Sequence, residues 1–472
     1  MCSGQCGTRR ARCGTLASGS EMITRLTLDN FKSWESTGVV RLAPISGVFG
    51  ANSSGKTSLL QLLLLLKQTA DSPDRALPLD FGNEQSQVSL GTFADVVYRH
   101  DDERSISWSI AWRPIKPLEI QLIKDRNVST VADENLAFTA SVGLTARGEQ
   151  RVAEMYYDFA GMRFGMSRLD SKNRYQLSGS GSPGFEFQRS RGRPPHVSAP
   201  LKSYGFPDLV KSYFLNAEFL SDFELAFEQL FSNVYYLGPL RTDPQRQYTW
   251  GGAQPSDVGR RGERSVDALL AARARDQKVD PGYRKRKIPL DKYVAMKLRD
   301  MGLVEDLDVE EVQKGSRIYQ VWVKYPGATT RVLLTDVGFG VSQVLPVVTL
   351  LYYVPEGSTV VLEQPEIHLH PAVQSALADV FIDAIERRSI QIVLESHSEH
   401  LLQRLQLRIA EEALTPDDVA LYFVDIESGR SSLTSLDVDP LGYISNWPPG
   451  FFGDRLAEAS SMSKAAARRN RA

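Results

Sequence analysis

The stretch Gly50-Ala-Asn-Ser-Ser-Gly-Lys-Thr57 decides the fold of this chain. It matches the pattern G-x-x-x-x-G-K-[ST] and lies between an apolar run over 45–49 and a leucine-rich run over 57–66. A buried strand, this loop and then a buried helix form the setting in which the pattern binds phosphate. Its glycines let backbone N–H groups turn inward around an anion, and the helix N-terminus adds partial positive charge. The sequence therefore predicts a site for a nucleoside triphosphate.

The loop also predicts what its side chains do. Lys56 is expected to reach the β- and γ-phosphates, and Thr57 is expected to ligate Mg²⁺. ATP and Mg²⁺ are thus the predicted cofactors. The residues predicted to line the nucleotide are Gly50, Asn52, Ser53, Ser54, Gly55, Lys56, Thr57 and Ser58.

Three later motifs extend the predicted site. Thr359-Val-Val-Leu-Glu-Gln-Pro-Glu366 is an apolar strand that ends at Glu363, where a Walker B acid holds Mg²⁺ through water. The apolar run over 390–395 leads directly to His397, which is thereby placed near the γ-phosphate. The Gly-rich segment 336–343 opens a helix and offers a second place for an anion. Two phosphate-type sites far apart in sequence suggest a composite active site.

From residue 332 onward, apolar runs of strand length alternate with runs of helix length. Strands are expected over 359–363, 390–395, 420–425 and 431–436, and a helix is expected over 372–387. Such alternation predicts a largely parallel sheet covered by helices. The predicted fold class is therefore α/β.

The rest of the chain is less regular. Residues 22–28 and 38–42 alternate apolar and polar around a turn-like segment 29–37, which predicts an antiparallel pair. Short alternating runs predict a β-rich region over 105–175, and 207–231 has helical spacing, with a buried stripe predicted at Leu209, Tyr213, Leu215, Phe219, Phe223 and Phe227. The predicted organisation is a disordered leader 1–21, an N-terminal head part 22–104, an inserted β-rich and helical subdomain 105–232, a linking α+β region 233–331, a C-terminal head part 332–454 and a flexible tail 455–472.

Composition narrows the class of protein. The chain has 472 residues, 42% hydrophobic and 24% charged residues and a formal net charge of −2, which is ordinary for a globular protein. No apolar stretch is long enough to span a bilayer, so we expect a cytoplasmic protein without a membrane partner. All three cysteines, Cys2, Cys6 and Cys13, lie in the expected leader, and a body without cysteine fits a reducing compartment.

Taken together, these motifs resemble the ABC-type ATPases of the RecF, SMC and OLD (overcoming lysogenization defect) group. The resemblance covers most of 22–450 and rests on 28–33, the phosphate loop, the turn 336–343, 363–371 and 395–400. It is nearest to short bacterial members without coiled-coil arms or a TOPRIM nuclease domain. It implies a P-loop NTPase head with a mixed sheet. It also implies a homodimer that sandwiches two ATP molecules, with Gly340 and Ser342 facing the γ-phosphate on the other subunit.

Two positions depart from the pattern of that group. Gln364 stands where the usual Asp-Glu pair has its glutamate, and an amide orients water without accepting its proton. Glu366, which the resembled group also carries, is the predicted catalytic base, and slow hydrolysis is expected. In the signature turn, Gly338 occupies the place of the usual serine, and Ser342 is expected to compensate.

Several patterns keep two interpretations. The histidines His368, His370, His397 and His400 predict either a metal site or parts of the family's motifs. Arg241 is read equally as a phosphate or interface residue and as an internal ion-pair partner. The basic run 284–287 is read as a solvated surface or as a nucleic-acid contact. Asp437 and Asp439 invite a nuclease reading, but too few residues follow them for a TOPRIM domain.

The predicted function is an ATP-hydrolysing ABC-type ATPase that dimerises on ATP and drives a partner protein or a DNA-associated process. The resemblance suggests DNA maintenance or phage defence, with an effector acting in trans. The alternative is a nucleotide-operated scaffold with negligible turnover, which recruits or releases an effector. A phosphotransferase is disfavoured because no acceptor motif is visible.

Overall fold

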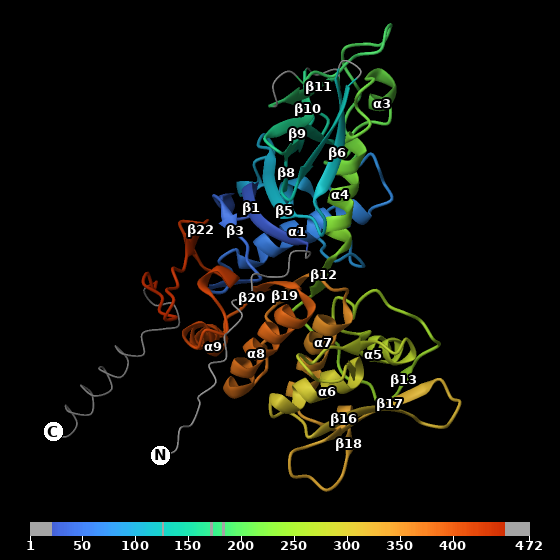
Figure 1. Ribbon diagram of the computed structural model, residues 1–472. Coiled ribbons are helices and arrows are strands. Elements are labelled where there is room, and N and C mark those ends of the chain that lie inside the picture. Colours follow the sequence, from blue (N-terminus) through green and yellow to red (C-terminus); the bar gives the residue numbers. More distant parts are fainter. Residues whose placement is uncertain (1–20, 125–126, 170–172, 182–184, 449–472) are drawn as a thin grey trace, which may run out of the picture.

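The computed structural model describes residues 21–124, 127–169, 173–181 and 185–448. A central sheet lies between an antiparallel lobe and a layer of helices (Figure 1). The three cysteines, nearly all of the expected leader and the whole of the expected tail 455–472 lie outside the described residues.

The central sheet has six strands: five are parallel to one another, and β22 pairs antiparallel with β21 at one edge. In spatial order they are β12 (Val234–Leu237), β19 (Thr359–Glu363), β20 (Gln391–Glu395), β4 (Ile45–Gly50), β21 (Val419–Glu427) and β22 (Arg430–Ser435). The α/β class and the strands expected over 359–363, 390–395, 420–425 and 431–436 are confirmed. Because the strands are parallel, the motifs that follow β4, β19 and β20 meet at one edge of the sheet.

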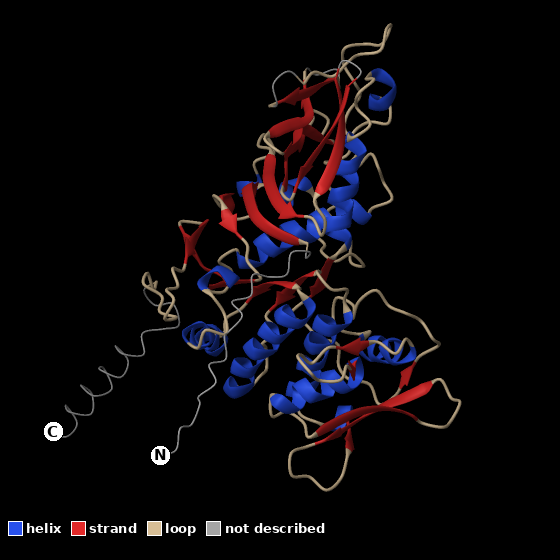
Figure 2. Ribbon diagram, in the orientation of Figure 1, coloured by secondary structure: helices blue, strands red, loops and turns tan. Residues whose placement is uncertain are grey.

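Alternate side chains of this sheet enter two different hydrophobic cores. Val361 and Val393 pack into the core shared with the antiparallel lobe, whereas Val360 and Leu362 pack into the core of the helical layer. Period-two alternation on strands buried on both faces explains why these strands are apolar throughout. α1 (Lys56–Asp71) lies between the central sheet and the antiparallel lobe, with its leucines from 59 to 66 buried (Figure 2).

The antiparallel lobe is built on one eight-stranded sheet. Its strands are β1 (Met22–Phe31), β2 (Trp34–Ser36), β3 (Val40–Arg41), β5 (Ile106–Arg113), β8 (Leu136–Leu144), β9 (Gln150–Phe159), β10 (Met162–Arg168) and β11 (Tyr175–Ser180), with a separate hairpin of β6 (Leu118–Lys124) and β7 (Asn127–Asp133). The expected antiparallel pair is confirmed, because β1 pairs with β3. The turn expected over 29–37 is wrong: β1 continues to Phe31, which pairs with Trp34 of β2, and both rings are buried. Strands from before and after residue 104 belong to this one sheet. The domain boundary predicted between 104 and 105 therefore stays a prediction.

The helix expected over 207–231 is interrupted. α3 (Val210–Tyr213) and α4 (Leu220–Ser232) are separated by an extended Phe214, and Leu209 and Leu215 are exposed rather than part of a buried stripe. At the interruption, the Asn216 side chain bonds backbone groups of distant segments: it accepts from the Gln188 N–H and donates to the Ile123 and Glu186 carbonyls. An asparagine that bonds backbone groups in this way competes with helix formation.

The helical layer covers the other face of the central sheet (Figure 2). It comprises α5 (Ser265–Ala274), α6 (Leu290–Asp300), α7 (Phe339–Tyr353), α8 (Pro371–Arg388) and α9 (Glu399–Ala410). Smaller elements flank it: β13 (Tyr248–Thr249), β14 (Lys278–Val279), β15 (Ile288–Pro289), β16 (Asp306–Glu311), β17 (Ile318–Lys324) and β18 (Val332–Leu333). A short α2 (Phe93–Val96) and three 3₁₀ turns, Tyr98–His100, Leu334–Asp336 and Pro416–Asp418, complete the described elements. Across the described ranges, no helix is both long and apolar enough to cross a bilayer.

Candidate nucleotide site

The phosphate loop joins β4 to α1, and two of its glycines are required by their surroundings. Gly50 has φ 143°, and a Cβ there would lie 2.1 Å from the Val424 carbonyl oxygen. Gly55 has φ 98°, and a Cβ there would lie 2.4 Å from the Ser431 Oγ. Any side chain at either position would therefore be strained and would clash. These contacts explain the motif's glycines in this chain and fix the loop above the sheet edge.

Lys56 lies inside the site. Its side chain is only 2% exposed, and its Nζ donates to the Ala51 carbonyl at 2.5 Å and lies 3.9 Å from a carboxylate oxygen of Glu395. Burial lowers the pKa of Lys56, while Glu395 and Glu366 act in the opposite direction. The ammonium thus folds back on its own loop, where the phosphates of a nucleotide would offer stronger acceptors.

Thr57 contacts a residue that the sequence analysis did not assign to the site. Its Oγ1 donates to Glu395 Oε2 at 2.6 Å, and the Glu395 side chain is buried. Glu395 ends β20 and stands beside Glu363 in the register of β19 and β20. Its position as the last residue of a predicted strand, directly before Ser396, was the available signal. Glu395 is therefore an acid of the site, beside Glu363 at the sheet edge.

Glu363 lies at the expected end of β19 and accepts a hydrogen bond from Tyr236 Oη at 3.0 Å. Burial, and next the neighbouring Glu395, raise the pKa of Glu363 to about 7, although Tyr236, Arg241 and Lys32 act against the shift. Two buried carboxylates side by side need a cation or a proton. Tyr236 is a second site residue that the sequence analysis did not assign.

The next residues hold a third carboxylate in place. Gln364 adopts φ 43°, and its N–H donates to the Glu395 carbonyl. This turn brings Glu366 under β20, where its Oε1 accepts from Ser396 Oγ at 2.8 Å and from the His397 N–H at 2.7 Å. Its Oε2 is buried without a hydrogen-bond partner among the described residues. Burial raises the pKa of Glu366, and these two donors oppose the shift.

His397 follows β20 and is half-buried beside the phosphate loop. Burial and the charge of Lys56 lower its pKa, and a hydrogen bond with the Gly50 backbone raises it. His370 instead caps α8, because its Nδ1 accepts from the Ala372 N–H at 3.3 Å. Within the described ranges, no group of three or more His, Cys, Asp or Glu side chains is suited to a metal. The hydrolase-type histidine metal site is therefore not supported.

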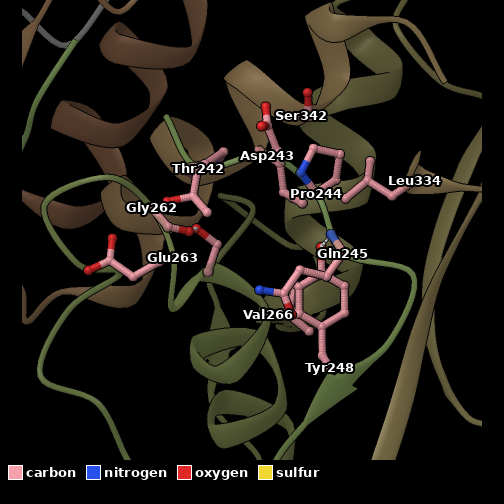
Figure 3. A pocket seen from close by; sticks show the side chains of 13 residues that line it. Thr242, Asp243, Pro244, Gln245, Tyr248, Gly262, Glu263, Val266, Leu334 and Ser342 are labelled. Atoms are coloured by element: carbon pink, nitrogen blue, oxygen red, sulfur yellow. Dashed lines mark hydrogen bonds between the residues drawn. The ribbon is translucent and has the colours of Figure 1, made fainter. Parts of the chain in front are cut away.

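The signature-like turn lies at the start of α7. Gly338 precedes the helix, Gly340 is in its first turn, and no side chain caps this N-terminus. Ser342 is 6% exposed, and its Oγ donates to the Phe339 carbonyl at 2.9 Å. Ser342 borders a small cavity of about 30 Å³ beside the segment 242–245, too small for a nucleotide (Figure 3). The Gly338 N–H donates to Tyr325 Oη at 2.9 Å, so Gly340 is the glycine of this turn whose amide is better placed than the Ser342 hydroxyl to meet a phosphate.

The structure thus brings together part of the predicted site. Lys56, Thr57, Glu363, Glu366 and His397 lie around one edge of the central sheet, and Asn52, Ser53, Ser54 and Ser58 belong to the loop or to the first turn of α1. Among the described contacts, none joins Gly340 or Ser342 to this group.

The residues present fit a nucleotide with its metal. Ser54 Oγ is buried without a described hydrogen-bond partner, the loop glycines permit close approach, and a hydroxyl and carboxylates are the oxygen donors that Mg²⁺ prefers. The chemistry of the donor set therefore agrees with the predicted cofactors.

Comparison with known proteins bears on the same region. Residues 221–403 match the family described as "AAA domain, putative AbiEii toxin, Type IV TA system". Residues 414–460 match a family described as a protein of unknown function, DUF3696. A search of curated proteins found no significant match to this chain.

Several solved structures are similar in outline. One is an SMC head bound to the C-winged helix domain of ScpA, with 11% identity, a TM-score of 0.44 and coverage of 88% of this chain and 98% of that one. The SMC head domain from Thermotoga maritima has 11% identity, a TM-score of 0.37 and coverage of 88% and 99%. The Smc head domain from Pyrococcus furiosus, with an extended coiled coil and bound to the C-terminal domain of ScpA, has 10% identity, a TM-score of 0.41 and coverage of 95% and 100%.

The family match spans β12, the signature-like turn, β19 and β20. The phosphate loop, on β4, joins the same sheet. Residues 221–403 therefore belong to the matched AAA-domain family.

Proposed function

We propose that this chain binds ATP with Mg²⁺, hydrolyses it slowly and uses the cycle to dimerise and to act on a partner protein. One observation carries the proposal: the phosphate-loop residues Lys56 and Thr57 already contact Glu395, an acid at the same sheet edge as Glu363. A lysine, a hydroxyl and acids gathered beside a phosphate loop are the parts that phosphoryl transfer to water requires.

Each side chain has a distinct role in this proposal. Lys56 would leave the Ala51 carbonyl and bind phosphate oxygens, and Thr57 and Glu363 would hold Mg²⁺. The metal, when bound, would neutralise charge on the β- and γ-phosphates. His397 contacts the γ-phosphate from the end of β20. Because burial and Lys56 lower its pKa, His397 is mainly neutral and donates through one ring nitrogen.

Glu366 is the proposed base. Ser396 and the His397 N–H hold one of its oxygens, and the other is left for the attacking water. Burial raises the pKa of Glu366 and so makes it a better proton acceptor than an exposed glutamate. Gln364 helps to orient that water without taking its proton.

Dimerisation is proposed from the start of α7. The N-terminal end of this helix could accept an anion. The residue at its N-cap, Gly338, supplies no side-chain cap, and a Cβ at that position would meet no described atom within 4 Å. Gly340 and Ser342 would face the nucleotide of a second subunit, with Gly340 making the closer contact. Phe339, 68% exposed at the same turn, would be covered in such a dimer.

The second candidate is a scaffold that ATP closes without turnover. Gln364 favours it, because the residue that follows the Walker B acid has no proton-accepting group. In either case the output would pass to an effector protein in trans, in DNA maintenance or phage defence. The exposed basic loop 284–287 would be the point of any DNA contact.

Steady-state phosphate release with and without Mg²⁺ tests the proposal. Glu366→Gln should reduce turnover at least 100-fold while ATP still binds, because proton acceptance is typically worth 10²–10⁴ in rate. Lys56→Ala should lose tight ATP binding, so its phosphate release gives the background rate of the assay. Glu356→Gln, an exposed change before β19, is the matched control and should keep wild-type turnover.

Each outcome separates the candidates. Turnover that survives Glu366→Gln would show that another group is the base. Mg²⁺-dependent ATP binding without any wild-type turnover would favour the scaffold. Wild-type ATP affinity in Lys56→Ala would contradict the nucleotide site itself. Added DNA that raises turnover would identify DNA as a partner.

A further inference from the structure

Arg241 is a buried cation without a visible partner. Its side chain is 6% exposed, and its Nε and both Nη atoms have no hydrogen-bond acceptor among the described residues. Arg388 is equally buried but donates to Glu356 and to the Val354 carbonyl. Burying an unpaired guanidinium is costly, so a ligand is the expected counterpart.

The backbone fixes where this guanidinium lies. Arg241 follows the carboxyl end of β12, and hydrogen bonds hold the chain on both sides of it: the Gly238 N–H donates to the Arg260 carbonyl, and the Thr242 N–H donates to the Arg261 carbonyl. These hydrogen bonds fix the backbone on both sides of Arg241. The residues around its side chain therefore indicate which group it binds.

Those surroundings are the acids of the nucleotide site. Tyr236, Glu363 and Glu366 act electrostatically on Arg241, but neither carboxylate forms an ion pair with it. Burial lowers the pKa of Arg241 to about 10, which still leaves it fully charged at neutral pH. The guanidinium thus lies close enough to these acids to feel their charge, but it donates a hydrogen bond to neither of them.

Sheet order places this group opposite Lys56. The order β12-β19-β20-β4 puts Arg241 after one edge strand and Lys56 after the strand three positions away, roughly 14 Å at the usual strand spacing. In the proposed ATP site, the loop beside Lys56 would receive the β-phosphate, and the terminal phosphate would be the group that extends toward Glu363 and β12. A planar fork with five donors suits such an oxyanion.

We propose that Arg241 binds the terminal phosphate of the nucleotide and distinguishes ATP from ADP. The inference rests on the proposed ATP site and adds to it a residue on the far side of the Walker B strand. The terminal phosphate replaces the acids as the closest partner of Arg241, so the cost of its burial is recovered only when a triphosphate is bound.

The test compares affinities for Mg²⁺ with a non-hydrolysable imido analogue of ATP, for ADP and for inorganic phosphate alone, by calorimetry. Arg241→Met should weaken binding of the analogue at least tenfold and binding of ADP less than twofold. Arg241→Lys should weaken binding of the analogue by less than Arg241→Met does, because lysine keeps the positive charge but loses the planar guanidinium. Arg388→Met is the matched control and should leave the ratio of the two affinities unchanged.

Thermal unfolding without nucleotide supplies a second readout. Arg241→Met should be as stable as the wild type or more so, whereas Arg388→Met should unfold at lower temperature because it strands the Val354 carbonyl. If Arg241→Met lost affinity equally for the analogue and for ADP, or lost affinity for neither, the inference would be overturned while the ATP site stood. The inference would also be overturned if inorganic phosphate alone bound equally well to the wild type and to Arg241→Met. A wild-type protein that binds no triphosphate would instead refute the proposed function.

Discussion

At the scale of single residues, Glu395 links the two halves of the site. It accepts from the Thr57 hydroxyl and lies near the Lys56 ammonium, both of which the nucleotide and its metal are proposed to recruit. Glu395 therefore either yields these groups to the ligand or stays beside the metal as an outer carboxylate. In both cases it adds negative charge where Mg²⁺ is proposed to bind.

We predict that Glu395→Gln weakens Mg²⁺ binding at the site and so raises its Mg²⁺ requirement. Removing a group that supports metal ligands typically costs 10–100-fold in metal affinity, so half-maximal ATP binding should need about tenfold more Mg²⁺. Calorimetric ATP titrations at graded Mg²⁺ measure this. Glu356→Gln serves again as control, and an unchanged Mg²⁺ requirement in Glu395→Gln would remove Glu395 from the metal's surroundings.

The sequence sufficed for residues that belong to compact motifs. Lys56, Thr57 and Glu363 stand at fixed positions in a loop or at a strand end, and the structure places them where those patterns predict. Tyr236 carries no such local pattern, and Glu395 carries only its position at the end of a predicted strand. They join the site only because β20 and β12 flank β19, and strand order is a property of the folded chain.

At the scale of elements, α4 shows how burial tunes an ionisable group away from the site. Glu224 on α4 accepts from the Phe206 N–H at 2.5 Å. Burial raises its pKa to about 7 from the usual 4.5, and this N–H opposes the shift. The helix could be expected from its spacing, but its start could not, because the interruption depends on what Asn216 bonds in distant segments.

We predict that Glu224 makes the fold more stable in acid than at neutral pH. The folded state binds this proton more tightly than the unfolded state, so the contribution is complete below about pH 4.5 and is lost as pH rises through about 7. Between pH 5 and 8 the wild type should lose of the order of 2 kcal/mol more unfolding free energy than Glu224→Gln, which keeps an acceptor for Phe206. Urea unfolding at several pH values measures the difference. Parallel curves for the two proteins would disprove it, and the exposed Glu218→Gln should follow the wild type.

At the scale of the whole molecule, the central sheet belongs to both hydrophobic cores. One core joins it to α1 and the antiparallel lobe, and the other joins it to α7 and α8. The phosphate loop leads into α1 on the first side, and the signature-like turn opens α7 on the second side. In the proposed dimer, a nucleotide would contact the phosphate loop of one subunit and the signature-like turn of the other. This division favours a site completed between two subunits.

We therefore predict that Mg²⁺ and ATP convert the monomer to a dimer, and that the first turn of α7 forms the contact. Light scattering of Glu366→Gln, in which ATP should persist, should show twice the monomer mass with ATP and the monomer with ADP. Phe339→Asp should bind ATP with wild-type affinity but remain monomeric, because it places a charge at the proposed interface. Val39→Asp changes an apolar side chain of nearly equal exposure, 69% against 68%, between β2 and β3, and should still dimerise. A Phe339→Asp protein that dimerises as well as Val39→Asp would place the subunit contact elsewhere and would remove Gly340 and Ser342 from the proposed composite site.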